Sequence, residues 1–197
     1  IARSQGPLAL LAPELGGADA LALPADLGDH RILPDLVAQV ERALGPVDLL
    51  INNAAVEQSR RYQDMATAEV HEAIAVNLTG PMLLGHAVLP GMIRRRCGHI
   101  VNVASLASFG GPPYQESYAA TKHGLLGFTR SLRASAYAEG HGVSASVVCP
   151  GFVSDAGMYH DMQQQTGIRA TGKFAASSPQ QVAAAVIRAV VEDVPEI

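Results

Sequence analysis

The sequence predicts an α/β protein built on a doubly wound parallel sheet. Four short apolar runs are typical of strands buried on both faces, and they span residues 20–25, 47–51, 99–103 and 143–148. Helical patterns alternate with them over residues 34–44, 67–96, 117–139 and 179–192. Because strands that alternate with helices form βαβ units, we expect one parallel sheet with helices on its faces.

The long helical stretch 67–96 contains a local weakness. Asn77-Leu78-Thr79-Gly80 groups three residue types that are poor helix formers. Such a cluster predicts a kink in the helix at this point.

Composition and charge limit the class of protein. The chain has 197 residues, of which 48% are hydrophobic and 16% charged, so we expect one folded domain over residues 1–197. The formal charge is −4, and Arg94-Arg95-Arg96 is too short a basic run to predict nucleic-acid binding. We find no apolar run of about 20 residues and no signal peptide, which predicts a cytoplasmic protein without a membrane span. Cys97, Cys149 and the scattered histidines predict neither a disulfide nor a metal site.

Tyr118 and Lys122 are the residues that point to chemistry. They are four residues apart in a predicted helix and therefore share one face, and Ser105 follows the third apolar run. A phenol with its ordinary pKa of about 10 transfers protons poorly at neutral pH, whereas a nearby ammonium favours the phenolate. The three groups together predict a proton-transfer site. Taken alone, a tyrosine and a lysine at this spacing are more often a surface pair.

Further motifs in the same order along the chain strengthen this prediction. Asn52-Asn53-Ala54-Ala55 precedes Asn77, and Pro150-Gly151 follows the fourth apolar run. With Ser105, Tyr118 and Lys122, this set resembles the short-chain dehydrogenase/reductase family over most of the chain. The resemblance implies a Rossmann-like fold and hydride transfer between a nicotinamide cofactor and a carbonyl or alcohol carbon.

The resemblance also implies the roles of the catalytic residues. Tyr118 is the proton donor, and Ser105 positions the substrate oxygen. Lys122 lowers the pKa of Tyr118 and binds the nicotinamide ribose. Asn77 holds a water that connects the lysine to solvent, and the alternative is that it only bends the helix. Ser108 competes with Ser105 for its role, but the spacing favours Ser105 and makes Ser108 a polar loop residue.

Cofactor contacts are implied for residues that follow the strands. Asp26 and Leu27 contact the adenine, although Asp26 could equally be a simple cap. Asn53, Ala54 and Ala55 contact the adenosine side, although two asparagines are also typical of a turn. Ala55 stands where the family usually has glycine. Pro150, Gly151 and Val153 contact the nicotinamide end, together with Tyr118 and Lys122. Asp155 replaces a threonine that is frequent in the family, and Ser154 is an alternative partner for the carboxamide.

Arg3 bears on the choice of dinucleotide. An acidic residue after the second strand of this fold binds the ribose 2′-hydroxyl, whereas an arginine accommodates a 2′-phosphate. Ala2-Arg3-Ser4 offers the arginine and no acid. We therefore expect NADP to be preferred, with NAD possible as the alternative cofactor, unless Arg3 is a solvated surface residue.

Residues 154–178 occupy the variable lid region of the family. Met158, Tyr159 and Met162 give this segment an apolar edge, and Phe152, Tyr114 and Glu57 are candidates for the pocket wall. We expect a small, mostly apolar carbonyl or alcohol substrate.

The sequence leaves two alternative functions open and predicts a homo-oligomer. A non-catalytic relative would bind a nucleotide or partner and regulate or scaffold. An epimerase or dehydratase acting on a sugar nucleotide would need more chain after the sheet. By resemblance, residues 67–96 and 117–139 pair with a second subunit in a homodimer or homotetramer. Leu125, Phe128 and Leu132 are apolar residues that we expect beyond the sheet-covered face.

The family's first strand and glycine-rich phosphate loop would precede Ile1, and its final strand would follow Ile197. Gly16-Gly17 precedes a predicted strand and cannot form that loop. We therefore expect the gene to encode a strand and a phosphate loop before Ile1. A chain of these 197 residues alone should then bind NADP weakly.

Overall fold

The computed structural model describes residues 1–15, 20–154, 158 and 176–197. Its sheet has three parallel strands in the order β1-β2-β3. They are β1 (Leu49–Asn52), β2 (Gly98–Val103) and β3 (Val143–Val148). Asn52 pairs with Asn102, and Val103 pairs with Val148, so the carboxyl ends of the strands lie at one edge of the sheet.

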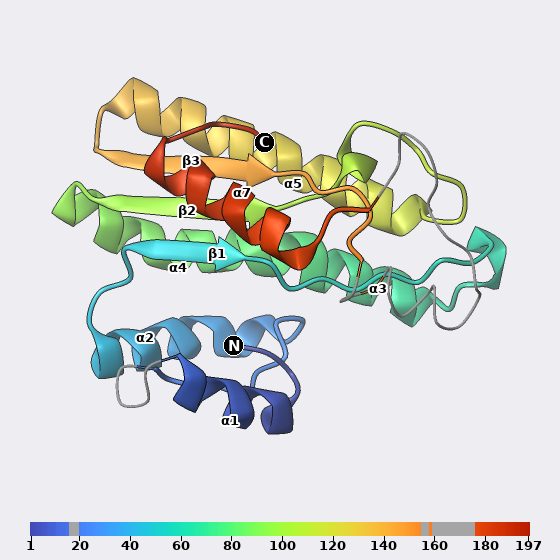
Figure 1. Cartoon of the computed structure of the whole chain (residues 1–197), viewed down its shortest axis with the longest axis horizontal. Coiled ribbons are helices and arrows are strands. Elements are labelled where there is room, and N and C mark those ends of the chain that lie inside the picture. Colours follow the sequence, from blue (N-terminus) through green and yellow to red (C-terminus); the bar gives the residue numbers. More distant parts are fainter. Residues whose placement is uncertain (16–19, 155–157, 159–175) are drawn as a thin grey trace.

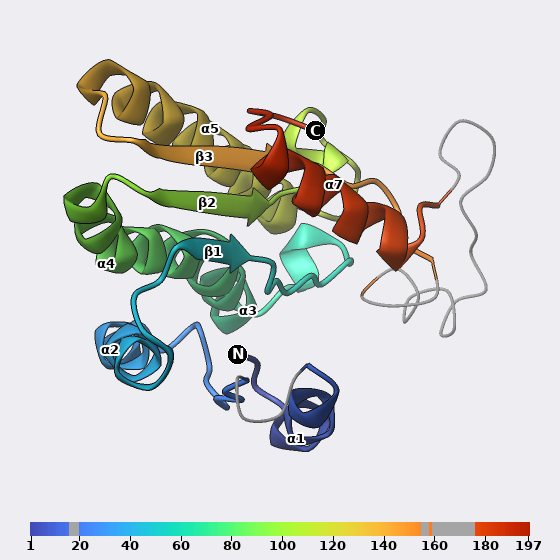
Figure 2. The ribbon, with the colours of Figure 1, turned by 60° about the vertical axis from the view of Figure 1, so that its left-hand side comes forward.

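Helices cover both faces of this sheet, which confirms the predicted fold class. α4 (Gly80–Arg95) and α5 (Glu116–Glu139) pack on one face, and α7 (Pro179–Val191) packs on the other (Figures 1 and 2). α2 (Leu33–Leu44) packs against α4, and α3 (Thr67–Ile74) lies beside α5. Short 3₁₀ turns complete the described connections: η2 (His30–Ile32), η3 (Tyr62–Asp64) and η5 (Leu106–Ser108).

The strand predicted at residues 20–25 does not join the sheet. Only one parallel bridge forms, between Ala2 and Pro24, and the amide of Ala25 donates to the carbonyl of Ala2 at 3.0 Å. A cavity of about 400 Å³ separates this pair from β1, and Leu49 and Ile51 of β1 remain exposed. The segment is extended but lacks a neighbouring strand in the described chain, and a parallel ladder cannot continue without one.

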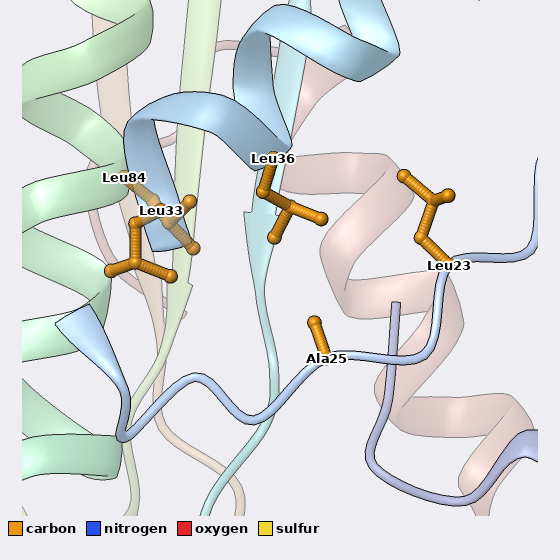
Figure 3. Packing of buried hydrophobic residues seen from close by; sticks show 5 residues of the cluster. All are labelled: Leu23, Ala25, Leu33, Leu36 and Leu84. Carbon is orange, nitrogen blue, oxygen red and sulfur yellow. The ribbon is translucent and has the colours of Figure 1, made fainter. Parts of the chain in front are cut away.

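The segment nevertheless belongs to the hydrophobic core. Leu23 and Ala25 pack with Leu33 and Leu36 of α2 and Leu84 of α4 (Figure 3). This cluster fixes α2 and the 20–25 segment against the sheet-bound helix. The apolar run was therefore a correct signal of burial but not of a strand.

The long helix 67–96 is interrupted where the sequence predicted. Residues Ala75–Thr79 form a π-helical turn, η4, between α3 and α4. By length and composition alone Thr67–Arg95 would be a candidate to cross a membrane, which our search for a continuous apolar run did not anticipate. In the structure α4 packs on β1 and β2, which is typical of a core helix.

Three other features differ from the sequence predictions. Gln5–Glu14 forms a helix, α1, that we did not predict. The last residues of the chain already pair with the segment at the end of β3, where we expected pairing only after Ile197: the amide of Cys149 donates to the carbonyl of Ile197 at 2.7 Å. Leu125 is buried in the core, and Phe128 and Leu132 are half-buried against it, so the sheet covers more of α5 than expected.

Candidate active site

The first turns of α5 carry the predicted proton-transfer pair. The helix begins at Glu116, where an acidic side chain favours the positive end of the helix dipole. Tyr118 is half-buried and Lys122 is 2% exposed. The Lys122 Nζ donates to the carbonyl of Val103 at 2.9 Å and lies 5.6 Å from the centroid of the Tyr118 ring. α5 therefore sets both groups at the carboxyl end of β2, and they are not a surface pair.

Burial governs the ionisation of both groups. Burial raises the pKa of Tyr118 to about 12; a hydrogen bond with Ser105 opposes this shift and the charge of Glu57 adds to it. Burial also lowers the pKa of Lys122 to about 8, against the opposing charges of Cys149 and Glu57. The expected lowering of the Tyr118 pKa is thus wrong for this structure, because desolvation outweighs any stabilisation of the phenolate. The phenol is protonated at neutral pH.

Ser105 and Ser108 take different positions. Ser105 is half-buried directly after β2 and Ala104, and its Oγ accepts from the amide of Ala107 at 3.1 Å. Its hydroxyl also acts on Tyr118, where it lowers the pKa of the phenol against the effect of burial. Ser108 is buried, and its Oγ donates to the carbonyl of Lys122 at 2.9 Å. Ser105 therefore faces the phenol, while Ser108 fastens η5 to α5.

Asn77 connects three segments from inside the π-helical turn. It is fully buried; its Oδ1 accepts from the amide of Val56, and its Nδ2 donates to the carbonyl of Val56, both at 2.8 Å. Its Nδ2 also donates to Thr121 Oγ1 at 3.3 Å, next to Lys122 on α5. The amide thus fixes the loop after β1 relative to the proton-transfer helix. Sequence reasoning missed the part played by Thr121, which nothing in the local pattern distinguishes.

Residues predicted to contact the cofactor meet in one cavity of about 240 Å³. Its lining includes Arg3, Asp26, Leu27, Ala54 and Ala55, which come from three separate segments. Asn53 lies on the neighbouring cavity beside β1 instead. A concave, partly polar site beyond the carboxyl ends of parallel strands is where this fold class binds nucleotides. The residues present therefore fit one end of a dinucleotide.

Two of these side chains already have partners. Arg3 Nη1 donates to Glu72 Oε1 at 2.9 Å in a half-exposed ion pair. Asp26 Oδ1 accepts from the amide of Gly28 at 2.9 Å in a local turn, and the helix cap that we held as the alternative is taken by Asp29, the N-cap of η2. Because Asp26 also lines the cavity, the turn contact and a ligand contact are compatible for this residue.

The segment after β3 approaches Ser105 from the other side. The carbonyl of Pro150 accepts from the amide of Leu106 at 2.8 Å, and a Cβ on Gly151 would come within 3.2 Å of Leu106. Val153 forms a parallel bridge with Ser177. Phe152 and Tyr114, candidates for the pocket wall, are 39% and 54% exposed. Most of the predicted lid, including Asp155, Tyr159 and Met162, lies outside the described residues.

Sequence reasoning missed a polar cluster at the α5 N-terminus. Glu57, which we had considered only as pocket wall, accepts hydrogen bonds from Gln115 Nε2 and from Ser59 Oγ. Gln115 immediately precedes α5. A glutamine and a serine in polar loops carry no distinguishing pattern, so only the fold could bring them together.

These features define a class of protein: a parallel α/β sheet that carries, at its carboxyl edge, a half-buried tyrosine beside a buried lysine and a cavity of about 240 Å³. Comparison with known sequences agrees. The profile of the short chain dehydrogenase family matches residues 1–167, and the chain belongs to this family of oxidoreductases.

Three relatives illustrate the similarity. Ketoacyl reductase HetN of Nostoc sp. (strain PCC 7120 / SAG 25.82 / UTEX 2576) is 37% identical over 199 residues, which cover 100% of this chain and 67% of that protein. Acetoacetyl-CoA reductase of Rhizobium meliloti (strain 1021) is 35% identical, covering 65% of this chain and 52% of its own length. Inactive 2-(S)-hydroxypropyl-CoM dehydrogenase 2 of Xanthobacter autotrophicus (strain ATCC BAA-1158 / Py2) is 38% identical, covering 72% and 61%. The chain thus spans about half to two thirds of these relatives.

Proposed function

We propose that the protein is an NAD(P)-dependent oxidoreductase that transfers a hydride between nicotinamide and the carbonyl or alcohol carbon of a small, mostly apolar substrate. The observation that carries the proposal is the half-buried Tyr118 beside the buried Lys122 on α5, with Ser105 acting on the pKa of the phenol. Two relatives are named for ketoacyl and acetoacetyl substrates, which makes β-keto esters the first substrates to test.

The chain's own residues account for the proton and the orientation. A bound nicotinamide supplies or accepts the hydride. Tyr118 remains protonated at neutral pH because its pKa is raised to about 12, so it can give a proton to a carbonyl oxygen during reduction. Ser105 donates to the same oxygen and positions it. Lys122, fixed by the carbonyl of Val103, offers a positive charge to the phenolate that remains and a donor to the ribose.

NADP is the cofactor that we favour, because Arg3 lines the proposed adenosine cavity.

The expected cytoplasmic location remains a prediction, as does the homodimer or homotetramer. Exposed Ile74, Met82 and Leu83 on α3 and α4 support pairing of these helices with a second subunit.

We also propose one Rossmann-like domain, completed by a further parallel strand in the 400 Å³ cavity beside β1. Among the described residues no strand pairs with the outer edge of β1, which supports this part of the proposal.

The second candidate function is nucleotide binding without catalysis. One relative has "inactive" in its name, and the raised pKa of Tyr118 disfavours the phenolate that would accept a proton from an alcohol in the oxidation direction. A complete set of Asn77, Ser105, Tyr118 and Lys122 favours the enzyme.

Turnover by Tyr118→Phe separates the two candidates. With NADPH and ethyl acetoacetate, we expect the variant to lose roughly 10²–10⁴-fold in kcat while NADPH affinity changes little. Tyr137→Phe, at a 91% exposed tyrosine near the other end of α5, is the matched control and should keep full activity. NADPH binding without turnover of any carbonyl in a broad panel would favour the non-catalytic function.

A further inference from the structure

Glu57 is a carboxylate that the proposed chemistry does not use, although it lies beside the proton-transfer pair. It is half-buried in the loop after β1. Its Oε1 accepts from Ser59 Oγ at 2.6 Å and from Gln115 Nε2, and Gln115 Nε2 donates to Ser59 Oγ at 3.2 Å. Because Gln115 immediately precedes α5, these bonds hold the carboxylate next to the turn that carries Tyr118.

The second oxygen of this carboxylate is available to a ligand. Both hydrogen bonds end on Oε1, and within the described part of the chain Oε2 accepts none. No cation among the described residues forms a salt bridge with Glu57, whereas the nearby Arg60 pairs with Glu69 at 3.0 Å. The negative charge of Glu57 is therefore not neutralised by a direct contact there.

The charge of Glu57 reaches the reacting groups. Its negative charge raises the pKa of Tyr118 and that of Lys122, so Glu57 interacts electrostatically with both groups. In a partly desolvated site, a like charge brought to the same place by a substrate would be repelled much more strongly than in water. A hydroxyl or protonated amine there would instead find an acceptor in Oε2.

We propose that Glu57 is a specificity-determining residue that acts as a charge filter on the substrate. The site admits carbonyl compounds that are neutral, or carry a hydrogen-bond donor, near the reacting carbon, and it excludes those with an anionic group there. This inference rests on the proposed function and adds its substrate class: esters and thioesters of keto acids are accepted, and the free acids are rejected.

The test uses two probes that differ in charge at the same position. Ethyl acetoacetate and acetoacetate share the keto group and carbon chain, but only acetoacetate carries a carboxylate. With the purified protein and NADPH, the ratio of kcat/KM for the ester to kcat/KM for the acid is measured in wild type, Glu57→Gln, Glu57→Asp and Asp64→Asn. We expect Glu57→Gln to lower this ratio roughly tenfold, mostly through the KM of acetoacetate, since an amide removes the charge but keeps the shape.

The control variants separate a charge filter from a structural brace. Glu57→Asp retains the negative charge and should therefore retain the ratio. If Glu57 only holds the loop after β1 in place, its substitution should instead reduce turnover of both probes together. Asp64→Asn removes an exposed carboxylate that pairs with Arg61 and should leave the ratio unchanged. An unchanged ratio in a folded, active Glu57→Gln would overturn the inference and leave the proposed function intact.

Failure of the proposed function gives a different result. If the wild type reduces neither probe, hydride transfer to this substrate class is contradicted, and calorimetric binding of the two probes to wild type and Glu57→Gln then decides the filter. Preferential gain of acetoacetate binding in Glu57→Gln would support the filter, and equal or absent binding in both proteins would overturn it.

Discussion

Lys122 Nζ donates to the carbonyl of Val103 at 2.9 Å, so the last residue of β2 fixes the position of the only cation found beneath the Tyr118 ring in the described chain. This bond ties the proton-transfer pair directly to the sheet. It also holds an ammonium where water is excluded, and burial accordingly lowers the pKa of Lys122 to about 8.

Lys122→Met should therefore lower the activity but preserve or raise the stability of the fold. At pH 7 both folded and unfolded wild type carry the charged lysine, and the folded state bears the full cost of burying it. We expect the variant to lose turnover and NADPH affinity but to match or exceed the wild type's free energy of unfolding at pH 7.

The pH dependence has a defined sign. The folded pKa of about 8 lies below the ordinary lysine pKa of 10.5, so the unfolded wild type binds more protons between these values and wild-type stability rises with pH there. The advantage of Lys122→Met should shrink from pH 8 to pH 10.5 in urea titrations. A constant difference across that range would show that the charge of Lys122 is not buried at a cost.

Dinucleotide preference should respond to the ion pair of Arg3 and Glu72. Arg3→Asp removes the proposed partner of a 2′-phosphate, and we expect the ratio of kcat/KM for NADPH to that for NADH to fall about tenfold. Glu72→Gln frees the guanidinium and should raise the same ratio. Arg31→Asp is the control with the same change of charge, because Arg31 also forms an exposed ion pair, with Asp29. If Arg3→Asp behaves like this control, Arg3 is only a surface residue.

Stability should fall at mildly acidic pH because of His99. Its Nε2 is hydrogen-bonded to Ser146 Oγ at 2.9 Å, and burial lowers its pKa, aided by Arg133 and opposed by Asp193. The folded state therefore resists protonation, and the free energy of unfolding should decrease as pH falls through about 6.5, the ordinary pKa of histidine.

His99→Gln isolates this effect. The variant keeps a polar group near Ser146 but cannot titrate, so its unfolding free energy in urea should vary less between pH 7.5 and pH 5 than that of the wild type. Parallel curves for the two proteins would mean that another group causes the acid sensitivity.

Local patterns were sufficient for much of this molecule. The apolar runs placed β2 and β3 to within one residue, and the spacing of Tyr118 and Lys122 predicted that they share one face of a helix, as they do on α5. The weak helix formers at Asn77 located the π-helical turn.

Features that depend on distant partners were not predictable in this way. Residues 20–25 had the composition of a strand, but strand formation also requires a neighbour to pair with. Glu57 and Gln115 are 58 residues apart, and His99 and Ser146 are 47 apart. The raised pKa of Tyr118 likewise follows from burial, which the spacing to Lys122 does not reveal.

The most direct test of hydride transfer follows the hydrogen itself. The protein is incubated with ethyl acetoacetate and NADPH that carries deuterium at nicotinamide C4, separately on each face, and the alcohol product is examined by mass spectrometry and NMR. The account predicts one deuterium on the new carbinol carbon from one of the two labelled cofactors, formed roughly 10²–10⁴-fold more slowly in Tyr118→Phe than in the wild type. Cofactor binding without any labelled alcohol, or an alcohol product without deuterium from either cofactor, would contradict it.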